Sequence, residues 1–217
     1  MSDPVIPVPE GVPVREGVPV RESGPVPELV EGLRDEPLEV DVTATETVYA
    51  GRVWDVRNDT FRYNGDDLVR QYVEHPGAAA IIALDDQDRV LLIQQYRHPI
   101  RHRDWEIPAG LLDVAGESPL ETAKRELIEE ADLTADDWQP LVSIFTTPGG
   151  NDEVVHLFLA RDLTPLGEAH AREAEEADIR VEWVPLTDAV TGVLEGRLRN
   201  GILSVGLLAA AEKLRRG

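Results

Sequence analysis

Cysteine is absent from this chain of 217 residues, and aromatic residues make up 5% of it. Disulfides are therefore excluded, and the first residues lack the charged start and apolar stretch of a secretory signal. No apolar run approaches the roughly 18 residues that span a bilayer. From these absences we expect a soluble, cytoplasmic protein built around one sizeable core.

Positive charge is also scarce, because 21 Lys and Arg residues stand against 42 Asp and Glu residues, which gives a net charge of −21. A field of this sign repels nucleic acids and anionic membranes, and the cationic residues form no dense cluster. We therefore expect neither as a partner. Small anionic substrates stay compatible, because a metal ion inverts the local field of a carboxylate site.

The first 40 residues repeat a short theme, VPVREG at 12–17 and VPVRE at 18–22. Prolines at this spacing keep a chain extended, and the segment has no core-forming period. We expect a disordered arm over residues 1–40. A peptide ligand for another protein is the alternative.

Residues 41–76 change to strand-like runs at 47–49, 52–57 and 68–73, with the turn signal Asn64-Gly65-Asp66 before the last run. This pattern predicts a small antiparallel sheet. Such a sheet is marginal by itself and needs the main domain or a second subunit to pack on.

Residues 77–217 alternate strand and helix patterns. The runs 78–84 and 90–96 are continuously apolar, which indicates strands buried on both faces. Further strands are expected at 141–146, 154–160 and 179–184, and helices at 121–131, 187–195 and 202–214. The pattern predicts an α/β domain in which helices cover both faces of a sheet.

The helix that begins near residue 118 has a clear start signal. Ser118 suits the N-cap, Pro119 suits the first helical position, and Glu121 completes a capping box. At about 100° per residue, one face is an apolar stripe made of Leu120, Ala123, Leu127 and Ala131. This stripe is expected to face the core.

Three carboxylates, Glu126, Glu129 and Glu130, fall in the arc beside that stripe. Like charges at this spacing repel unless cations neutralise them, and oxygen ligands suit Mg²⁺ or Mn²⁺. The arrangement therefore predicts a metal site directed at phosphate. The plain alternative is the solvated face of an acidic helix, with Arg125 and Glu129 as an i,i+4 ion pair.

The segment from Gly110 to Leu133 resembles the signature of the Nudix hydrolase family, G-x5-E-x7-R-E-U-x-E-E-x-G-U, where U is a bulky aliphatic residue. Two departures are visible. Six residues rather than five separate Gly110 from Glu117, and Asp132 stands where the signature has its last glycine. The extra residue lies in a loop, and aspartate can adopt a left-handed turn.

Three further segments, at 94–98, 105–111 and 147–153, look like the ADP-ribose pyrophosphatase subgroup of that family. Together the resemblance covers most of residues 46–215. It implies a Nudix-type α/β/α sandwich with a mixed sheet over residues 77–217. It also implies that the small antiparallel sheet of residues 41–76 packs against a second subunit in a homodimer.

The resemblance also assigns roles to single residues. Metal ligands would be Glu126, Glu130, the Ala109 carbonyl and Glu129, which is also a candidate catalytic carboxylate. Arg125 would orient a glutamate, and Glu117 would support the loop. Glu153 matches a loop glutamate that serves as general base or additional ligand, with a surface carboxylate as its alternative.

Substrate contacts are implied for Arg97, Glu106, Trp54 and Arg70. Arg97 would contact a phosphate or the terminal ribose, and Glu106 would orient a substrate hydroxyl or an arginine. Trp54 would stack on adenine and Arg70 would approach the substrate. The alternatives are a surface salt bridge for Arg97 and ordinary interface packing for Trp54 and Arg70.

The resemblance therefore implies an enzyme acting on phosphorus-containing anhydrides, with Mg²⁺ or Mn²⁺, that cleaves ADP-ribose to AMP and ribose 5-phosphate. Family membership does not fix the substrate, so another NDP-sugar, a dinucleotide or an oxidised nucleotide stays open. A non-catalytic nucleotide-binding module and a structural acidic protein are the remaining alternatives.

Overall fold

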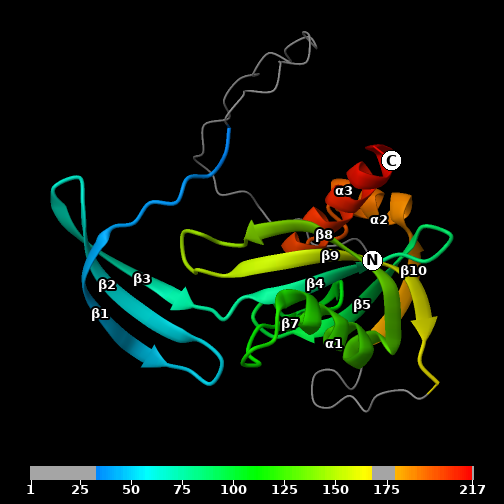
Figure 1. Cartoon of the computed structure of the whole chain (residues 1–217), viewed down its shortest axis with the longest axis horizontal. Helices are drawn as coiled ribbons and strands as arrows, with labels where there is room; N and C mark the ends of the chain where they lie inside the picture. Colours follow the sequence, from blue (N-terminus) through cyan, green and yellow to red (C-terminus); the bar gives the residue numbers. More distant parts are fainter. Residues whose placement is uncertain (1–32, 168–178, 217) are drawn as a thin grey trace, which may run out of the picture. The chain divides into compact units, whose positions relative to one another are not determined.

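The computed structural model describes residues 33–167 and 179–216 (Figure 1). Contacts divide the chain into two units, Met1–Glu39 and Val40–Gly217, and the second unit carries the fold. Residues 33–40 are exposed and have no regular secondary structure. The remainder of the predicted arm, residues 1–32, lies outside the described residues.

The first sheet is antiparallel, with the order β1 (Asp41–Ala50), β2 (Asp55–Tyr63), β3 (Asp66–Glu74). Asn64 and Gly65 form its two-residue turn with φ of 52° and 91°, as the Asn-Gly signal predicts. The expected strand at residues 52–57 is wrong at its start, because residues 52–54 lie in the connection before β2. There the Gly51 N–H donates to the Asp55 side chain, which closes a loop instead.

Two more sheets form the main domain. The mixed sheet has the order β7 (Ala109–Leu111), β4 (Ala78–Ala83), β9 (Val154–Pro165), β8 (Leu133–Phe145), with β4 parallel to β9. The antiparallel sheet has the order β10 (Arg180–Pro185), β5 (Arg89–Arg97), β6 (His102–Glu106). The consecutive strands β4 and β5 thus belong to different sheets and meet through an isolated bridge between Leu84 and Val90.

Alternate side chains of β4 enter two different cores, because successive residues of a strand point to opposite faces. Ala79 and Ile81 pack with Leu127 of helix α1 (Pro119–Ala131). Ala80 and Ile82 pack against the other two helices, α2 (Leu186–Leu194) and α3 (Gly201–Arg216). Figure 1 shows α1 on one side of the sheet and α2 and α3 on the other, which confirms the predicted α/β/α layers.

The ends of α1 form as the sequence predicts. Ser118 accepts the Glu121 N–H at 3.3 Å, and the Glu121 carboxylate accepts the Ser118 N–H at 2.7 Å. Asp132 ends the helix in the left-handed conformation with φ of 56°, where the signature has glycine. The departure at this position is therefore accommodated by the backbone.

Among the described residues, no helix has both the length and the apolar character needed to cross a membrane. The cytoplasmic location stays a prediction.

Candidate functional site

Arg125 connects three of the predicted site carboxylates. Its Nε and Nη2 donate to Glu117 at 3.2 Å, and its Nη1 donates to Glu126 at 2.5 Å and to Glu129 at 3.0 Å. The hydrogen bond to Glu117 raises the pKa of Arg125 further and lowers the pKa of Glu117. Thr122, which is fully buried, donates a further hydrogen bond to Glu117. Glu117 thus ties the loop before α1 to the helix.

Glu130 is 5% exposed, which disagrees with the alternative of a fully solvated acidic face for this arc. Its carboxylate accepts the Ala109 N–H at 2.9 Å, and this contact joins α1 to β7. A buried carboxylate is costly without such a donor. The sequence prediction concerns the Ala109 carbonyl, and the structure shows in addition that the N–H of the same residue positions Glu130.

Gly110 makes room for Glu126. A Cβ atom built at Gly110 would lie 1.9 Å from the Glu126 Oε1 and 2.0 Å from its Cδ. Any side chain here would therefore displace the Glu126 carboxylate. The first glycine of the signature is explained by this close approach.

The donors gathered at this site are hard oxygen atoms, which fit Mg²⁺ or Mn²⁺ in chemistry. In residues 33–167 and 179–216, however, no three acidic or histidine side chains converge as a metal-binding group. The Arg125 guanidinium lies among Glu117, Glu126 and Glu129 and forms an ion pair with each of them. The site thus contains the oxygen atoms that a divalent metal prefers, and Gly110 leaves room for the Glu126 carboxylate. The positive charge of Arg125 offsets the negative charge of these carboxylates.

Arg97 and Glu106, both predicted substrate contacts, lie together. Arg97 donates through Nε and Nη2 to the two Glu106 oxygens at 2.7 and 2.6 Å, a bidentate pair. The Glu106 side chain is 8% exposed and the Arg97 side chain is 45% exposed. Gln95, which the sequence does not single out, also donates to Glu106. The buried carboxylate thus holds an arginine that reaches the surface.

Glu153 lies at the end of the 147–153 loop, immediately before β9. The Thr146 hydroxyl donates to its Oε2 at 2.5 Å, and the Asn151 side chain accepts its N–H at 3.3 Å. The His75 Nε2 lies 3.5 Å from its Oε1. Thr146 and His75 are missed by sequence reasoning, because no local pattern marks them and His75 lies 78 positions before Glu153.

The predicted adenine contacts lie around β1–β3. Trp54 stands in the connection between β1 and β2, is 48% exposed, and has its ring 5.6 Å from the His75 ring. Arg70, on β3, is exposed and donates to the carbonyl of Val69. The structure thus links Trp54 to the Glu153 loop through His75.

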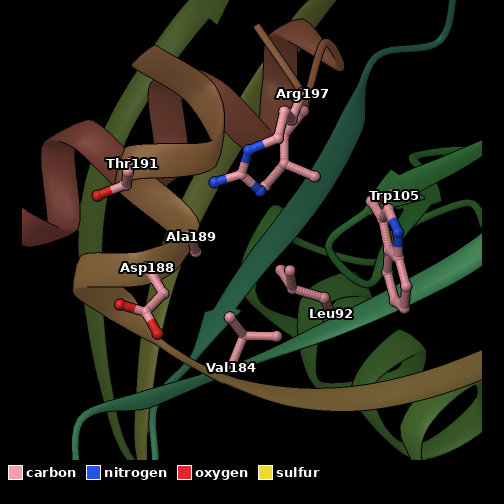
Figure 2. A pocket seen from close by; sticks show the side chains of 8 residues that line it. Leu92, Trp105, Val184, Asp188, Ala189, Thr191 and Arg197 are labelled. Carbon is pink, nitrogen blue, oxygen red and sulfur yellow. The ribbon is translucent and has the colours of Figure 1, made fainter. Parts of the chain in front are cut away.

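A cavity of about 430 Å³ lies between α2 and the sheet β10-β5-β6 (Figure 2). Its lining residues are Leu92, Trp105, Val184, Asp188, Ala189, Thr191, Arg197 and Leu198. None of these is a predicted site residue. The cavity is thus separate from the carboxylates of α1.

Comparisons with known proteins match the same region. The family model described as NUDIX domain matches residues 74–202. An ADP-ribose pyrophosphatase of Mycobacterium tuberculosis is 44% identical over 79% of this chain and 83% of its own length. An ADP-ribose pyrophosphatase of Bacillus subtilis is 38% identical over 70% of this chain and 82% of its own length.

A third relative, named methanol dehydrogenase activator, from Bacillus methanolicus, is 34% identical over 79% of this chain and 93% of its own length. The crystal structure of an ADP compounds hydrolase has the same fold, with a TM-score of 0.69 at 22% identity over 84% of this chain and 97% of that chain. With the family model covering more than half of its residues, this chain belongs to the Nudix family.

Proposed function

We propose that this Nudix hydrolase cleaves the pyrophosphate of ADP-ribose and releases AMP and ribose 5-phosphate. The observation that carries the proposal is the set of α1 carboxylates at the signature positions: Arg125 donates to Glu126 and Glu129, and the Ala109 N–H donates to Glu130. The substrate is supported by the two relatives named ADP-ribose pyrophosphatase, which align over most of the chain.

The groups that would hold Mg²⁺ or Mn²⁺ are the carboxylates of Glu126, Glu129 and Glu130 and the Ala109 carbonyl. Such an ion, when bound, supplies water activation and neutralises the phosphate oxygens. The chain's own contribution is positional. Arg125 restrains Glu126 and Glu129, and the Ala109 N–H restrains Glu130.

Glu153 acts as the general base in this proposal. It takes one proton from the attacking water, whose oxygen forms a bond to a phosphorus atom of the pyrophosphate. The bond from that phosphorus to the bridging oxygen breaks, and the bridging oxygen leaves with the other phosphate. The support for Glu153 is that each of its oxygens has its own neighbour: the Thr146 hydroxyl donates to Oε2, and the His75 Nε2 lies 3.5 Å from Oε1.

Arg97 binds a phosphate or the terminal ribose in this proposal, and Glu106 orients it. The bidentate contact fixes the plane of the guanidinium, while the exposure of Arg97 leaves part of it accessible to substrate.

We also propose that residues 41–76 form a dimerisation subdomain beside the catalytic domain of residues 77–217. The sheet β1–β3 and its connections expose large apolar side chains, which favour a protein partner: Val42, Val48, Tyr49, Val53, Trp54, Tyr63 and Val69. Trp54 and Arg70 would then reach the adenine bound by the partner. Light scattering after size exclusion should give a dimer for the intact protein and a monomer for Tyr49→Asp. A monomeric intact protein would exclude this arrangement.

The function is tested by turnover of ADP-ribose, ADP-glucose, NADH and 8-oxo-dGTP with Mg²⁺ or Mn²⁺, with products separated by chromatography. We expect AMP from ADP-ribose, and we expect Glu130→Gln to abolish it. The matched control is Glu121→Gln on the same helix, because glutamine preserves the capping box. If the enzyme preferred another substrate of this panel, the proposed mechanism would stand and only the proposed substrate would be revised. The absence of turnover with every substrate would favour a non-catalytic nucleotide-binding module.

A further inference from the structure

His75 is a buried histidine whose neighbours define which of its ring nitrogens carries a proton. Its side chain is 7% exposed. The Gly77 N–H donates to the His75 Nδ1 at 3.0 Å, so Nδ1 presents a lone pair. The proton of the neutral ring therefore resides on Nε2.

The Glu153 carboxylate is the acidic neighbour of this nitrogen, with 3.5 Å between Nε2 and Oε1. This separation is long for a hydrogen bond, as is common for catalytic contacts before substrate binds. The other oxygen, Oε2, accepts the Thr146 hydroxyl. The Glu153 side chain is 16% exposed, and each of its carboxylate oxygens has one of these two neighbours.

The position of His75 is itself fixed by the loop that carries Glu153. The His75 N–H donates to the Asp152 side chain at 2.8 Å. Two residues earlier, the Val73 N–H donates to the Gly150 carbonyl at 2.9 Å, in a parallel bridge between β3 and the loop. The His75 ring also lies close to the Trp54 ring, with 5.6 Å between their centroids. His75 and the loop therefore form one connected unit.

We propose that His75 is a positioning residue, which donates its Nε2–H to Glu153 and holds that carboxylate in the orientation needed to accept a proton from water. The proposal rests on the function proposed above, in which Glu153 is the general base. Since misplacing a catalytic group by about 1 Å costs roughly 100-fold in rate, losing this contact should lower kcat by about 10- to 100-fold.

Two substitutions distinguish the roles of the two ring nitrogens of His75. In His75→Asn, the amide oxygen replaces Nδ1 and preserves the Gly77 contact, but nothing replaces Nε2. In His75→Gln, the amide nitrogen replaces Nε2 and preserves the donor to Glu153. We expect His75→Asn to lose kcat at unchanged KM for ADP-ribose, and His75→Gln to recover most of it, while both melt within a few degrees of the parent protein.

A double-mutant cycle with Glu153→Gln provides the decisive comparison. If His75 acts through Glu153, His75→Asn should cause no further loss of kcat in the Glu153→Gln background. A full kcat in His75→Asn alone, or an equal loss in both backgrounds, would overturn the proposal.

Imidazole ¹⁵N chemical shifts test the contact without any turnover. The His75 signal, identified by its absence in His75→Asn, should show the Nε2–H tautomer and should move in Glu153→Gln. An Nδ1–H tautomer would overturn the inference. The expected tautomer without ADP-ribose turnover would refute the proposed function alone.

Discussion

Gly110→Ala offers a sharp test of the site, because the added methyl group meets a single side chain. A Cβ at this position would lie 1.9 Å from the Glu126 Oε1, and a real Cβ does not come closer than 3.0 Å to another heavy atom. The oxygen must therefore retreat by about 1.1 Å. A displacement of this size at a reacting centre corresponds to roughly a 100-fold loss of rate.

The effect on stability should be small by comparison. The displaced atoms belong to the single side chain of Glu126, which can change its rotamer, while Arg125 keeps its hydrogen bonds to Glu117 and Glu129. The φ of Gly110 is not in the left-handed region, so alanine imposes no backbone strain. We expect kcat/KM for ADP-ribose to fall about 100-fold, with the melting temperature within a few degrees of the parent.

The matched control is Gly201→Ala at the start of α3, where a Cβ meets no atom within 4 Å. It should retain full activity. If Gly110→Ala kept kcat/KM within about threefold of the parent, the position of the Glu126 carboxylate would not matter, and the assignment of Glu126 as a metal ligand would be refuted.

Arg97→Lys should lower the free energy of unfolding in urea by about 1–2 kcal/mol, because an ammonium cannot make the bidentate contact with the buried Glu106; an unchanged midpoint would contradict this. Hydrogen bonds from Arg215 and Arg216 lower the pKa of Glu212 to about 2 from 4.5, so its stabilisation is present above pH 4.5 and is lost as the pH falls toward 2. The difference in melting temperature between the parent and Glu212→Gln should therefore narrow below pH 4.5, and a constant difference would disprove the contact. Deleting the first 40 residues should leave kcat and KM for ADP-ribose unchanged, and a large loss of activity would show that the arm takes part in function.

Local signals predicted much of the fold. Short-range hydrogen bonds form the capping box of Ser118, and the positive φ values of Asn64 and Gly65 form their turn, so a few adjacent residues suffice to predict both. Strand β8 was predicted at residues 141–146, whereas it begins at Leu133. Pro140 and an acidic pair interrupt its pattern, and the structure accommodates the proline at a register shift in the pairing with β9. Pairing with a distant strand overrides local preference here.

The candidate site was predictable where it follows helical spacing. The arc of Glu126, Glu129 and Glu130 is a property of α1 alone. The burial of Glu130 is not, because the N–H that compensates it comes from Ala109 on another element. The same holds for His75, whose contact with Glu153 exists only once the first sheet and the loop are paired.

The Arg125 guanidinium, which bonds three carboxylates at once, has a consequence for how this site can vary. A substitution at any one of these four side chains changes how the charges of the other three are balanced. The effects of such substitutions on activity should therefore not be additive. We therefore expect one energetically coupled group, made of Arg125, Glu117, Glu126 and Glu129. Attempts to alter the metal preference of this enzyme by design would have to redesign that group together.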